Sequence, residues 1–146
     1  MHHPTALTRE AAAELLRRHG ITPTHQRLEI AHVLFARRQH LSADQIMAMV
    51  NLRHSETSKA TVYNTLKLFL EKGMIREVIV DPSKVFYDSN TAPHHHFYNT
   101  ASGELIDIDA EDMQVQGLPA LPPGMVAERV DVIIRIRPEA AAAVTA

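Results

Sequence analysis

The first half of this 146-residue chain places four helical segments ahead of one β-hairpin, an order that few folds share. Each helical segment follows a residue of a type that caps helices and carries apolar residues at helical spacing. These capping residues are Thr8, Thr24, Ser42 and Ser58. After Gly73 the chain has two β-branched runs on either side of the turn sequence Asp81-Pro82-Ser83-Lys84, which predicts a hairpin. The sequence therefore predicts a helical body with a two-stranded ribbon attached.

The last helical segment, residues 59–72, gathers its apolar residues on one face and leaves a polar face opposite. With a hairpin directly after it, this is the order of a winged helix-turn-helix, in which residues 59–72 form the recognition helix and residues 76–88 the wing. The candidate DNA contacts on the polar face are Lys59, Thr61, Tyr63, Asn64 and Lys67. The lysines and the nearby Arg53 suit phosphates, whereas the other side chains suit base edges or thymine methyl groups. The alternative is a merely solvated helix face.

Charge is unevenly distributed along the chain and favours the DNA interpretation. Residues 1–80 carry 11 Lys/Arg against 7 Asp/Glu, a balance of +4, and residues 81–146 carry 4 against 10, a balance of −6. A basic module joined to an acidic one is typical of a polyanion-binding domain attached to something else. We expect a DNA-binding domain over residues 1–88, a hinge over 89–93, and a dimerisation and sensing domain over 94–146.

The second half predicts a small sheet. Residues 94–100 and 104–110 are short strands around a Ser-Gly turn, residues 110–117 form one or two helical turns, and residues 128–137 alternate as a strand. A unit this small buries little core alone, so we expect a homodimer that pairs two copies. The predicted fold class is α+β, an N-terminal winged helix-turn-helix domain plus a small C-terminal α/β dimerisation domain.

Several classes of protein are excluded or disfavoured. The chain has no cysteine, which excludes disulfides, thiolate zinc sites and a cysteine nucleophile. No apolar run approaches the roughly 20 residues of a membrane span, and the N-terminus lacks a secretion signal, so we expect a cytoplasmic protein with no membrane partner. The common catalytic motifs and glycine-rich phosphate loops are missing, so an enzyme is not expected.

The run His94-His95-His96 is the strongest candidate for metal chemistry. On a strand, period two puts His94 and His96 on one face and His95 on the other. Two histidines spaced this way are a common half-site for a divalent metal, although a histidine run is also found by chance on surfaces. With carboxylates nearby in sequence at Asp88, Asp107 and Asp109, the set would suit iron, manganese or zinc.

The chain resembles the ferric uptake regulator (Fur) family. The resemblance rests on GITPTHQRLEIAHVLF, HLSADQI, ATVYNTLKLFLEKGMI and HHHF, in that order, and covers residues 8–137. Within the family, VFYDSNTAPHHHFY, GELIDI and LPPGMVAERVDVIIRIR look like the iron response regulator (Irr) branch of alpha-proteobacteria.

The resemblance implies a sensing site between the two domains that holds one divalent ion. Carried over position by position, its ligands are His40, Asp88, His94, His96 and Asp107. Its occupancy would set the angle between the DNA-binding arms of the dimer. The resemblance also implies a double-stranded DNA operator as partner.

Three departures from the family pattern stand out. Asn99 and Ser102 occupy the places of the first cysteine pair of the family's structural zinc site, so no cysteine-ligated zinc is expected. The places of a further family metal site, around Pro93, Gln114 and Val130, hold no suitable set of ligands. Asn64 stands where most members have an arginine, which implies a different operator, since an amide prefers adenine and an arginine prefers guanine.

The Irr branch implies haem as the signal, with His94, His95 and His96 as the haem-binding element. His95, on the opposite strand face, could bind haem without disturbing the ion site. The function implied is a regulator of iron or haem homeostasis genes, a repressor or an activator, that binds DNA when iron is low and is inactivated by haem. The alternatives are a Fur-like repressor that responds directly to Mn²⁺, Fe²⁺ or Zn²⁺, and a metal-handling protein or metalloenzyme with no DNA role.

Overall fold

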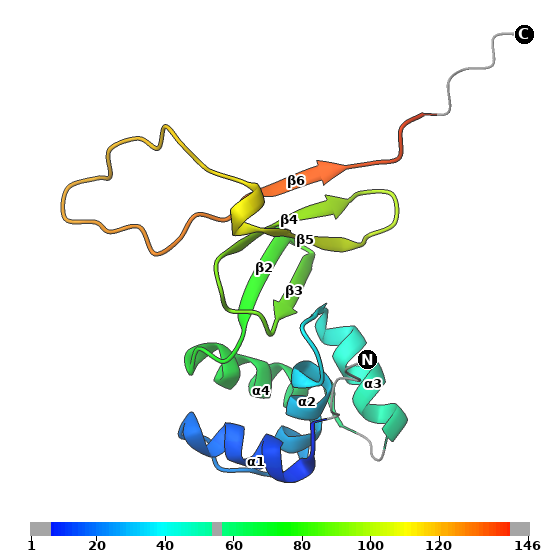
Figure 1. Ribbon diagram of the computed structural model, residues 1–146. Helices are drawn as coiled ribbons and strands as arrows, with labels where there is room; N and C mark the ends of the chain where they lie inside the picture. Colours follow the sequence, from blue (N-terminus) through cyan, green and yellow to red (C-terminus); the bar gives the residue numbers. More distant parts are fainter. Residues whose placement is uncertain (1–6, 54–56, 141–146) are drawn as a thin grey trace, which may run out of the picture. The chain divides into compact units, whose positions relative to one another are not determined.

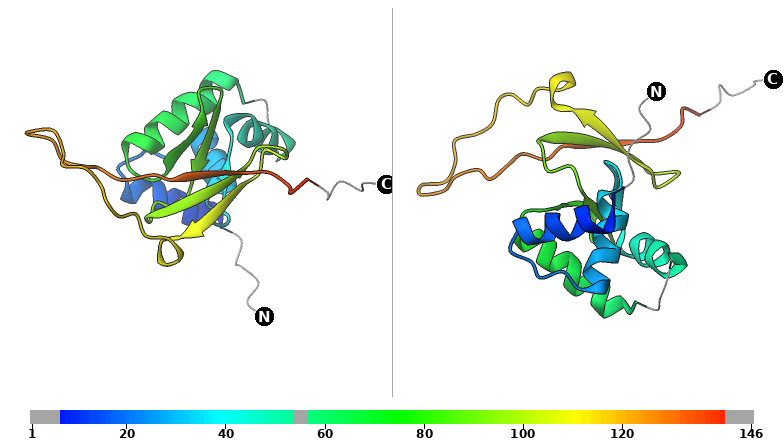
Figure 2. Two further views of the ribbon diagram at one scale, coloured as in Figure 1. Left: turned by 90° about the horizontal axis from the view of Figure 1, so that it is seen from above. Right: turned by 60° about the horizontal axis from the view of Figure 1, so that its bottom comes forward.

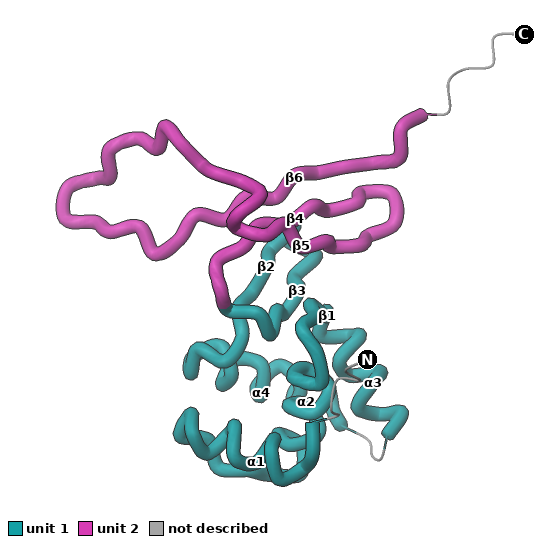
Figure 3. The backbone as a smooth tube through the Cα atoms, viewed as in Figure 1, with its two compact units in different colours: residues 1–91 teal, residues 92–146 magenta. Residues whose placement is uncertain are grey.

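The computed structural model describes residues 7–53 and 57–140. The chain divides into two compact units, Met1–Thr91 and Ala92–Ala146 (Figure 3). The ends of the predicted ranges 1–88 and 94–146 include residues 1–6 and 141–146, which lie outside the described residues. None of the helices in the described ranges is both long and apolar enough to cross a membrane.

Four helices form the body of the first unit, as the capping signals predict (Figure 1). They are α1 (Arg9–Arg18), α2 (His25–Phe35), α3 (Ala43–Arg53) and α4 (Lys59–Glu71). Before α3, Ser42 and Gln45 form a reciprocal capping box: the Gln45 backbone N–H donates to Ser42 Oγ at 3.2 Å, and the Ser42 N–H donates to Gln45 Oε1 at 2.9 Å. Gly20, with a φ of 73°, follows the end of α1 in a conformation that favours glycine.

The wing follows α4 as a small antiparallel sheet. Strands β2 (Arg76–Asp81) and β3 (Lys84–Asp88) form the predicted hairpin, and the turn is held by the Asp81 carboxylate, which accepts from the Ser83 N–H at 2.8 Å. A third strand, β1 (His40–Leu41), was not predicted; it pairs with β3, so that the sheet order is β1-β3-β2. The wing is thereby joined to the loop that precedes α3.

One hydrophobic core holds the first unit together. Its fully buried side chains come from all four helices and include Leu16, Ile30, Leu34, Ile46, Leu66 and Phe69. Each such side chain contributes roughly 1.5–3 kcal/mol on burial. Because Leu66 and Phe69 take the inner face of α4 into this core, the opposite face of that helix is left for solvent or a partner.

The second unit is a three-stranded sheet with a long irregular connection. Its strands are β4 (His94–Asn99), β5 (Leu105–Asp109) and β6 (Ile133–Ile136), with a single 3-10 turn, η1 (Ala110–Asp112), after β5. The sheet order is β5-β4-β6, with β5 antiparallel and β6 parallel to β4. Figure 2 shows the connection from η1 to β6 leaving the sheet and returning to it. The apolar side chains buried among the described residues of this unit are only Tyr98, Leu105 and Ile108.

The predicted strand over residues 128–137 is wrong in extent, because β6 covers only Ile133–Ile136. The ladder to β4 begins at Val132, whose carbonyl accepts from the His96 N–H at 3.1 Å, while its own N–H donates to the ring Nδ1 of His95 at 3.1 Å. Residues 128–131 pair with no strand among the described residues, and without a partner strand an alternating pattern does not form a ladder. The helical turns predicted over residues 110–117 are likewise reduced to η1.

Candidate metal centre and nucleic-acid face

Strand β4 separates the three histidines by face, as the period of a strand requires. His94 and His96 are buried, with exposed fractions of 5% and 2%, whereas His95 on the other face is half-buried. The rings of His94 and His96 lie 4.5 Å apart between centroids at an interplanar angle of 65°. Two imidazoles are thus held side by side in the interior, where polar groups need partners.

Asp107 on β5 supplies the partner for both rings. The antiparallel register pairs His96 with Asp107 across the two strands. Oδ1 of Asp107 lies 3.3 Å from Nε2 of His96 and 3.5 Å from Nε2 of His94. Ligand atoms around a tetrahedral ion with bonds of about 2.1 Å lie about 3.4 Å apart. Each histidine nitrogen therefore lies at the spacing from the carboxylate oxygen that two ligands of a single ion have.

The backbone fixes which nitrogen of His94 can bind a metal. Its Nδ1 lies 2.7 Å from the carbonyl oxygen of Ala92, and because a carbonyl only accepts, Nδ1 must carry the proton. The lone pair of the neutral ring is then on Nε2, which faces Asp107. A carbonyl behind a ligating histidine is the common way in which proteins orient metal-binding imidazoles.

The remaining two expected ligands meet in the first unit. His40 on β1 is the register partner of Asp88 at the end of β3. Asp88 is 1% exposed, and its Oδ1 accepts from the backbone N–H of Asn90 at 2.8 Å. The His40 ring packs edge-on against Phe86, with centroids 6.1 Å apart. The five expected ligands therefore form two groups, His40 with Asp88 in one unit and His94, His96 and Asp107 in the other.

His95 has a structural contact that sequence reasoning did not foresee. Because its Nδ1 accepts the Val132 N–H, the proton of the neutral ring must be on Nε2. Coordination of iron through Nε2 would require the other tautomer, and that tautomer would place two N–H groups against each other. The hydrogen bond just before the start of strand β6 thus opposes the use of His95 as a haem ligand.

Helix α4 presents the five predicted DNA contacts on its outer face. Lys59, Tyr63, Asn64 and Lys67 are exposed, and Thr61 is half-buried. The Lys59 ammonium lies 5.9 Å from the centroid of the Tyr63 ring, and the Thr61 hydroxyl is hydrogen-bonded to that of Ser58 at 2.9 Å. The arrangement offers two cations, an aromatic ring and an amide along one side of a helix, which suits the major groove of DNA.

Arg53, which the sequence placed among the phosphate contacts, has partners within the protein. Its Nε donates to Oε2 of the buried Glu29 at 3.3 Å, and its NH1 donates to Nε2 of His32 at 2.8 Å. An arginine held in this way connects α3 to α2. Its structural role is therefore better supported than a role in DNA binding.

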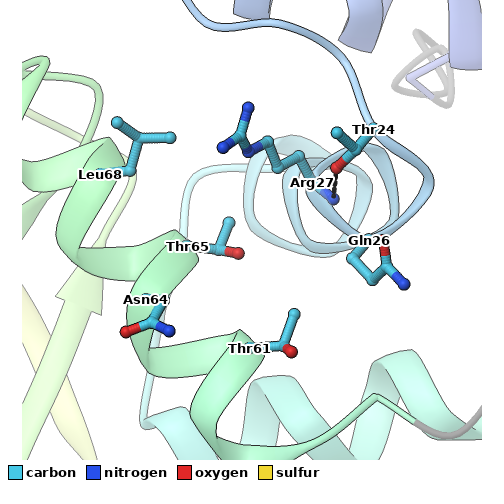
Figure 4. Close-up of a pocket in the computed structure, with 7 residues that line it drawn as sticks. All are labelled: Thr24, Gln26, Arg27, Thr61, Asn64, Thr65 and Leu68. Atoms are coloured by element: carbon cyan, nitrogen blue, oxygen red, sulfur yellow. Dashed lines mark hydrogen bonds between the residues drawn. The ribbon is translucent and has the colours of Figure 1, made fainter.

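A pocket beside α4 brings together residues that the sequence did not associate (Figure 4). It is lined by Thr24, Gln26, Arg27, Thr61, Asn64, Thr65 and Leu68. The first three belong to the start of α2, so they reach α4 only through helix packing. No sequence spacing could have linked the two groups, and only Thr61 and Asn64 were candidates beforehand.

The fold defines a winged-helix protein, and the histidine cluster is a candidate metal site in its second unit. The chain belongs to the ferric uptake regulator family: the family model described as "Ferric uptake regulator family" matches residues 18–121. Members of this family are transcription regulators and not enzymes. The predicted family and the predicted α+β fold class are confirmed, and the narrower Irr assignment stays a prediction.

Known relatives show both sequence and fold similarity. The peroxide-responsive repressor PerR of Staphylococcus epidermidis is 31% identical over 98 residues, which span 67% of this chain and 65% of the repressor. The Pseudomonas aeruginosa ferric uptake regulator, solved with manganese, is 20% identical with a TM-score of 0.65 over 88% of this chain and 98% of that chain. The Francisella tularensis ferric uptake regulator, solved with iron, is 20% identical with a TM-score of 0.64 over 82% and 93%. At such identities the structures establish the fold alone.

Proposed function

We propose that this protein is a DNA-binding transcription regulator that responds to a divalent metal ion. The observation that carries the proposal is the convergence of two buried imidazoles on one carboxylate, in a chain whose α4 exposes a polar face. Membership of the ferric uptake regulator family supports it, as do relatives whose structures hold manganese or iron. With nitrogen and oxygen ligands only, Mn²⁺, Fe²⁺ and Zn²⁺ are the ions that suit the set.

The complete site would join both groups of ligands. His94, His96 and Asp107 would bind the ion from the second unit, while His40 and Asp88 would bind it from the first. Because the latter two are a cross-strand pair in the sheet of the wing, they can approach one ion together. Binding by both groups would restrict the first unit relative to the second, and an ion that favours one arrangement shifts the population toward it.

DNA binding would use a homodimer. The few apolar side chains buried in the second unit favour pairing with a second copy of this chain. We assign DNA binding to residues 1–88, a hinge to 89–93 and dimerisation with sensing to 94–146. Two α4 helices, each contributing Lys59, Thr61, Tyr63, Asn64 and Lys67, would then read two half-sites of an operator.

The test is DNA binding with and without metal. Binding to the promoter of the protein's own gene, followed by fluorescence anisotropy, should be strong with Mn²⁺ and weak after chelation, and His96→Ala should behave as the chelated protein does. Lys67→Ala should weaken DNA binding while leaving Mn²⁺ affinity unchanged. The proposal would be refuted if the affinity for the duplex changed neither on chelation of the metal nor in His96→Ala.

A haem-responsive regulator of the Irr type is the second candidate. It is favoured by the three consecutive histidines and by the resemblance of residues 85–98 to that branch, and it would bind DNA when iron is low and lose DNA when haem binds. The contacts of the histidines weigh against it. His94 and His96 are buried beside Asp107, and His95 is hydrogen-bonded through Nδ1 in the tautomer that does not expose a lone pair on Nε2.

A haem titration of the protein–DNA complex separates the two candidates. The haem-responsive regulator requires a Soret shift at stoichiometric haem together with release of DNA, and both must be lost in a His94→Ala, His95→Ala and His96→Ala triple variant. The ion-responsive regulator requires that DNA affinity follow Mn²⁺ and ignore haem.

A further inference from the structure

The pocket between the start of α2 and one side of α4 lies within the first unit and contains none of the expected metal ligands (Figure 4). Its volume is about 270 Å³, far above the roughly 10–15 Å³ of cavity space that is enough to hold one water molecule. Its lining is polar except for Leu68 and contains one cation, Arg27, and no carboxylate. The space therefore suits an anion larger than water.

Thr65 is the feature of this pocket that points to a ligand. It is only 6% exposed, and its hydroxyl makes no hydrogen bond within the part of the chain that the structure describes. Figure 4 shows the side chain projecting from α4 toward the first turn of α2. Threonine hydroxyls inside helices commonly donate to a backbone carbonyl of the preceding turn, and this one does not. The hydroxyl oxygen is not among the fully enclosed unpaired side-chain atoms of the described residues, so it opens to the pocket and can donate to a ligand there.

The opposite wall offers positive potential. Thr24 caps α2 and accepts the Arg27 backbone N–H at 3.3 Å, while the N–H groups of His25 and Gln26 belong to the first turn, whose donors have no carbonyl within the helix. The Arg27 guanidinium is anchored through NH1 to the carbonyl of Thr22 at 2.9 Å. A helix start, an anchored guanidinium and an unpaired hydroxyl surround one space.

We propose that this pocket binds one phosphate of the DNA backbone, held by the Thr65 hydroxyl, the Arg27 guanidinium and the first turn of α2. The inference rests on the proposed DNA-binding function and adds a specific phosphate contact to it. DNA is favoured over a free anion because Thr61 and Asn64, two of the candidate DNA contacts, line the same pocket. A phosphate fixed beside Asn64 sets the depth and register at which α4 enters the groove.

The decisive variant is Thr65→Val, which removes the hydroxyl and keeps the shape of the side chain. Because the hydroxyl has no partner in the described structure, Thr65→Val should unfold at the same temperature as the wild type or a higher one. It should nevertheless bind DNA roughly ten-fold more weakly, the usual effect of losing one hydrogen bond to a charged group. A purely structural Thr65 would show the opposite pattern, with stability lost and affinity kept.

The matched charge variants are Arg27→Gln in the pocket and Arg17→Gln on the exposed surface of α1. Affinity for a short duplex of the promoter of the protein's own gene is measured by anisotropy over a range of salt concentrations. Arg27→Gln should reduce the slope of log affinity against log salt by about one per chain, whereas Thr65→Val and Arg17→Gln should leave the slope unchanged.

The outcomes distinguish failure of this inference from failure of the proposed function. Wild-type protein that binds no duplex at low salt refutes both. Wild-type binding that Thr65→Val and Arg27→Gln leave unaltered refutes the phosphate pocket alone. A third outcome also refutes it: inorganic phosphate raises the unfolding temperature of the wild type but not of Thr65→Val or Arg27→Gln, while both variants bind the duplex as the wild type does. The pocket would then bind a free anion and not the DNA backbone.

Discussion

Asp107 is the residue on which the metal site depends most. The Nε2 atoms of His96 and His94 lie 3.3 and 3.5 Å from the same carboxylate oxygen of Asp107. Replacing the anion by an amide in Asp107→Asn keeps the shape and removes the charge that balances a divalent ion. We expect Mn²⁺ affinity, measured by calorimetry, to fall by roughly two orders of magnitude, which corresponds to about 3 kcal/mol for the loss of a charged partner.

Asp109 provides the control for that measurement. It is the register partner of His94 on the same strand as Asp107, but it is exposed and belongs to no cluster of metal-binding type among the described residues. Asp109→Asn changes the net charge by the same amount and should leave Mn²⁺ affinity within two-fold of the wild type. Equal losses in the two variants would mean that the local negative potential, and not coordination, attracts the ion.

His95 shows how one residue of a run can differ in role from its neighbours. Its Nδ1 accepts the Val132 N–H and so attaches the start of β6 to β4. His95→Ala should therefore lower the free energy of unfolding by about 1 kcal/mol, the contribution of a typical hydrogen bond. Urea unfolding measures that loss. Mn²⁺ affinity should be unchanged, and a variant that unfolds normally but loses metal would contradict the structural role.

At the scale of elements, buried Glu29 connects three helices. It accepts from Arg53 of α3 at 3.3 Å and lies 3.8 Å from Arg9 of α1. Arg53→Met should destabilise the protein by about 1–3 kcal/mol, because it leaves a buried carboxylate without its nearest partner and removes the donor to His32.

Arg9→Met is the comparison for this ion pair. Arg9 is 60% exposed at the side chain and its contact with Glu29 is longer, so the loss on thermal unfolding should stay below about 1 kcal/mol. A larger loss for Arg9→Met than for Arg53→Met would show that α1, and not α3, is the main partner of Glu29.

The sequence predicted the elements whose signals are local. The four helices carry their own caps, and the wing carries its own turn, so each could be placed without knowledge of the rest. Strand β1 could not, because two residues have no period and only pairing with β3 defines them. Strand β6 was overextended because it includes only the residues that pair with β4, and the alternation of residues 128–137 does not show where that pairing begins.

The candidate site was predictable to the extent that it is local to one hairpin. The alternation of β4 separates His95 from His94 and His96, and a short turn brings Asp107 opposite His96. The role expected of His40 came from family resemblance alone, whereas Asp88 was already a candidate because it lies near the histidine run in sequence. The pocket around Thr65 was missed entirely, because the packing of α2 beside α4 is decided by the whole core.

At the scale of the whole molecule, the absence of cysteine leads us to expect that dimer formation does not depend on a bound metal, whereas DNA binding does. A thiolate zinc site contributes directly to folding, and removal of its metal unfolds such a domain. This chain has no cysteine and so no thiolate zinc site, and in the regulator we propose, packing and pairing between copies would hold the second unit together. Chelation with EDTA should therefore leave the mass of the dimer unchanged in analytical ultracentrifugation, while DNA affinity falls.

If the metal binds only at the histidine cluster, its effect on the free energy of unfolding can also be predicted. Mn²⁺ at one hundred times its dissociation constant should raise the free energy of unfolding by about 2.7 kcal/mol, since it binds only the folded protein. For a chain of this length the midpoint of thermal unfolding should rise by roughly 5–10 °C, and Asp107→Asn should remove most of that rise. Dissociation of the dimer on chelation would place a metal in the assembly itself, and a site outside the histidine cluster would then be required.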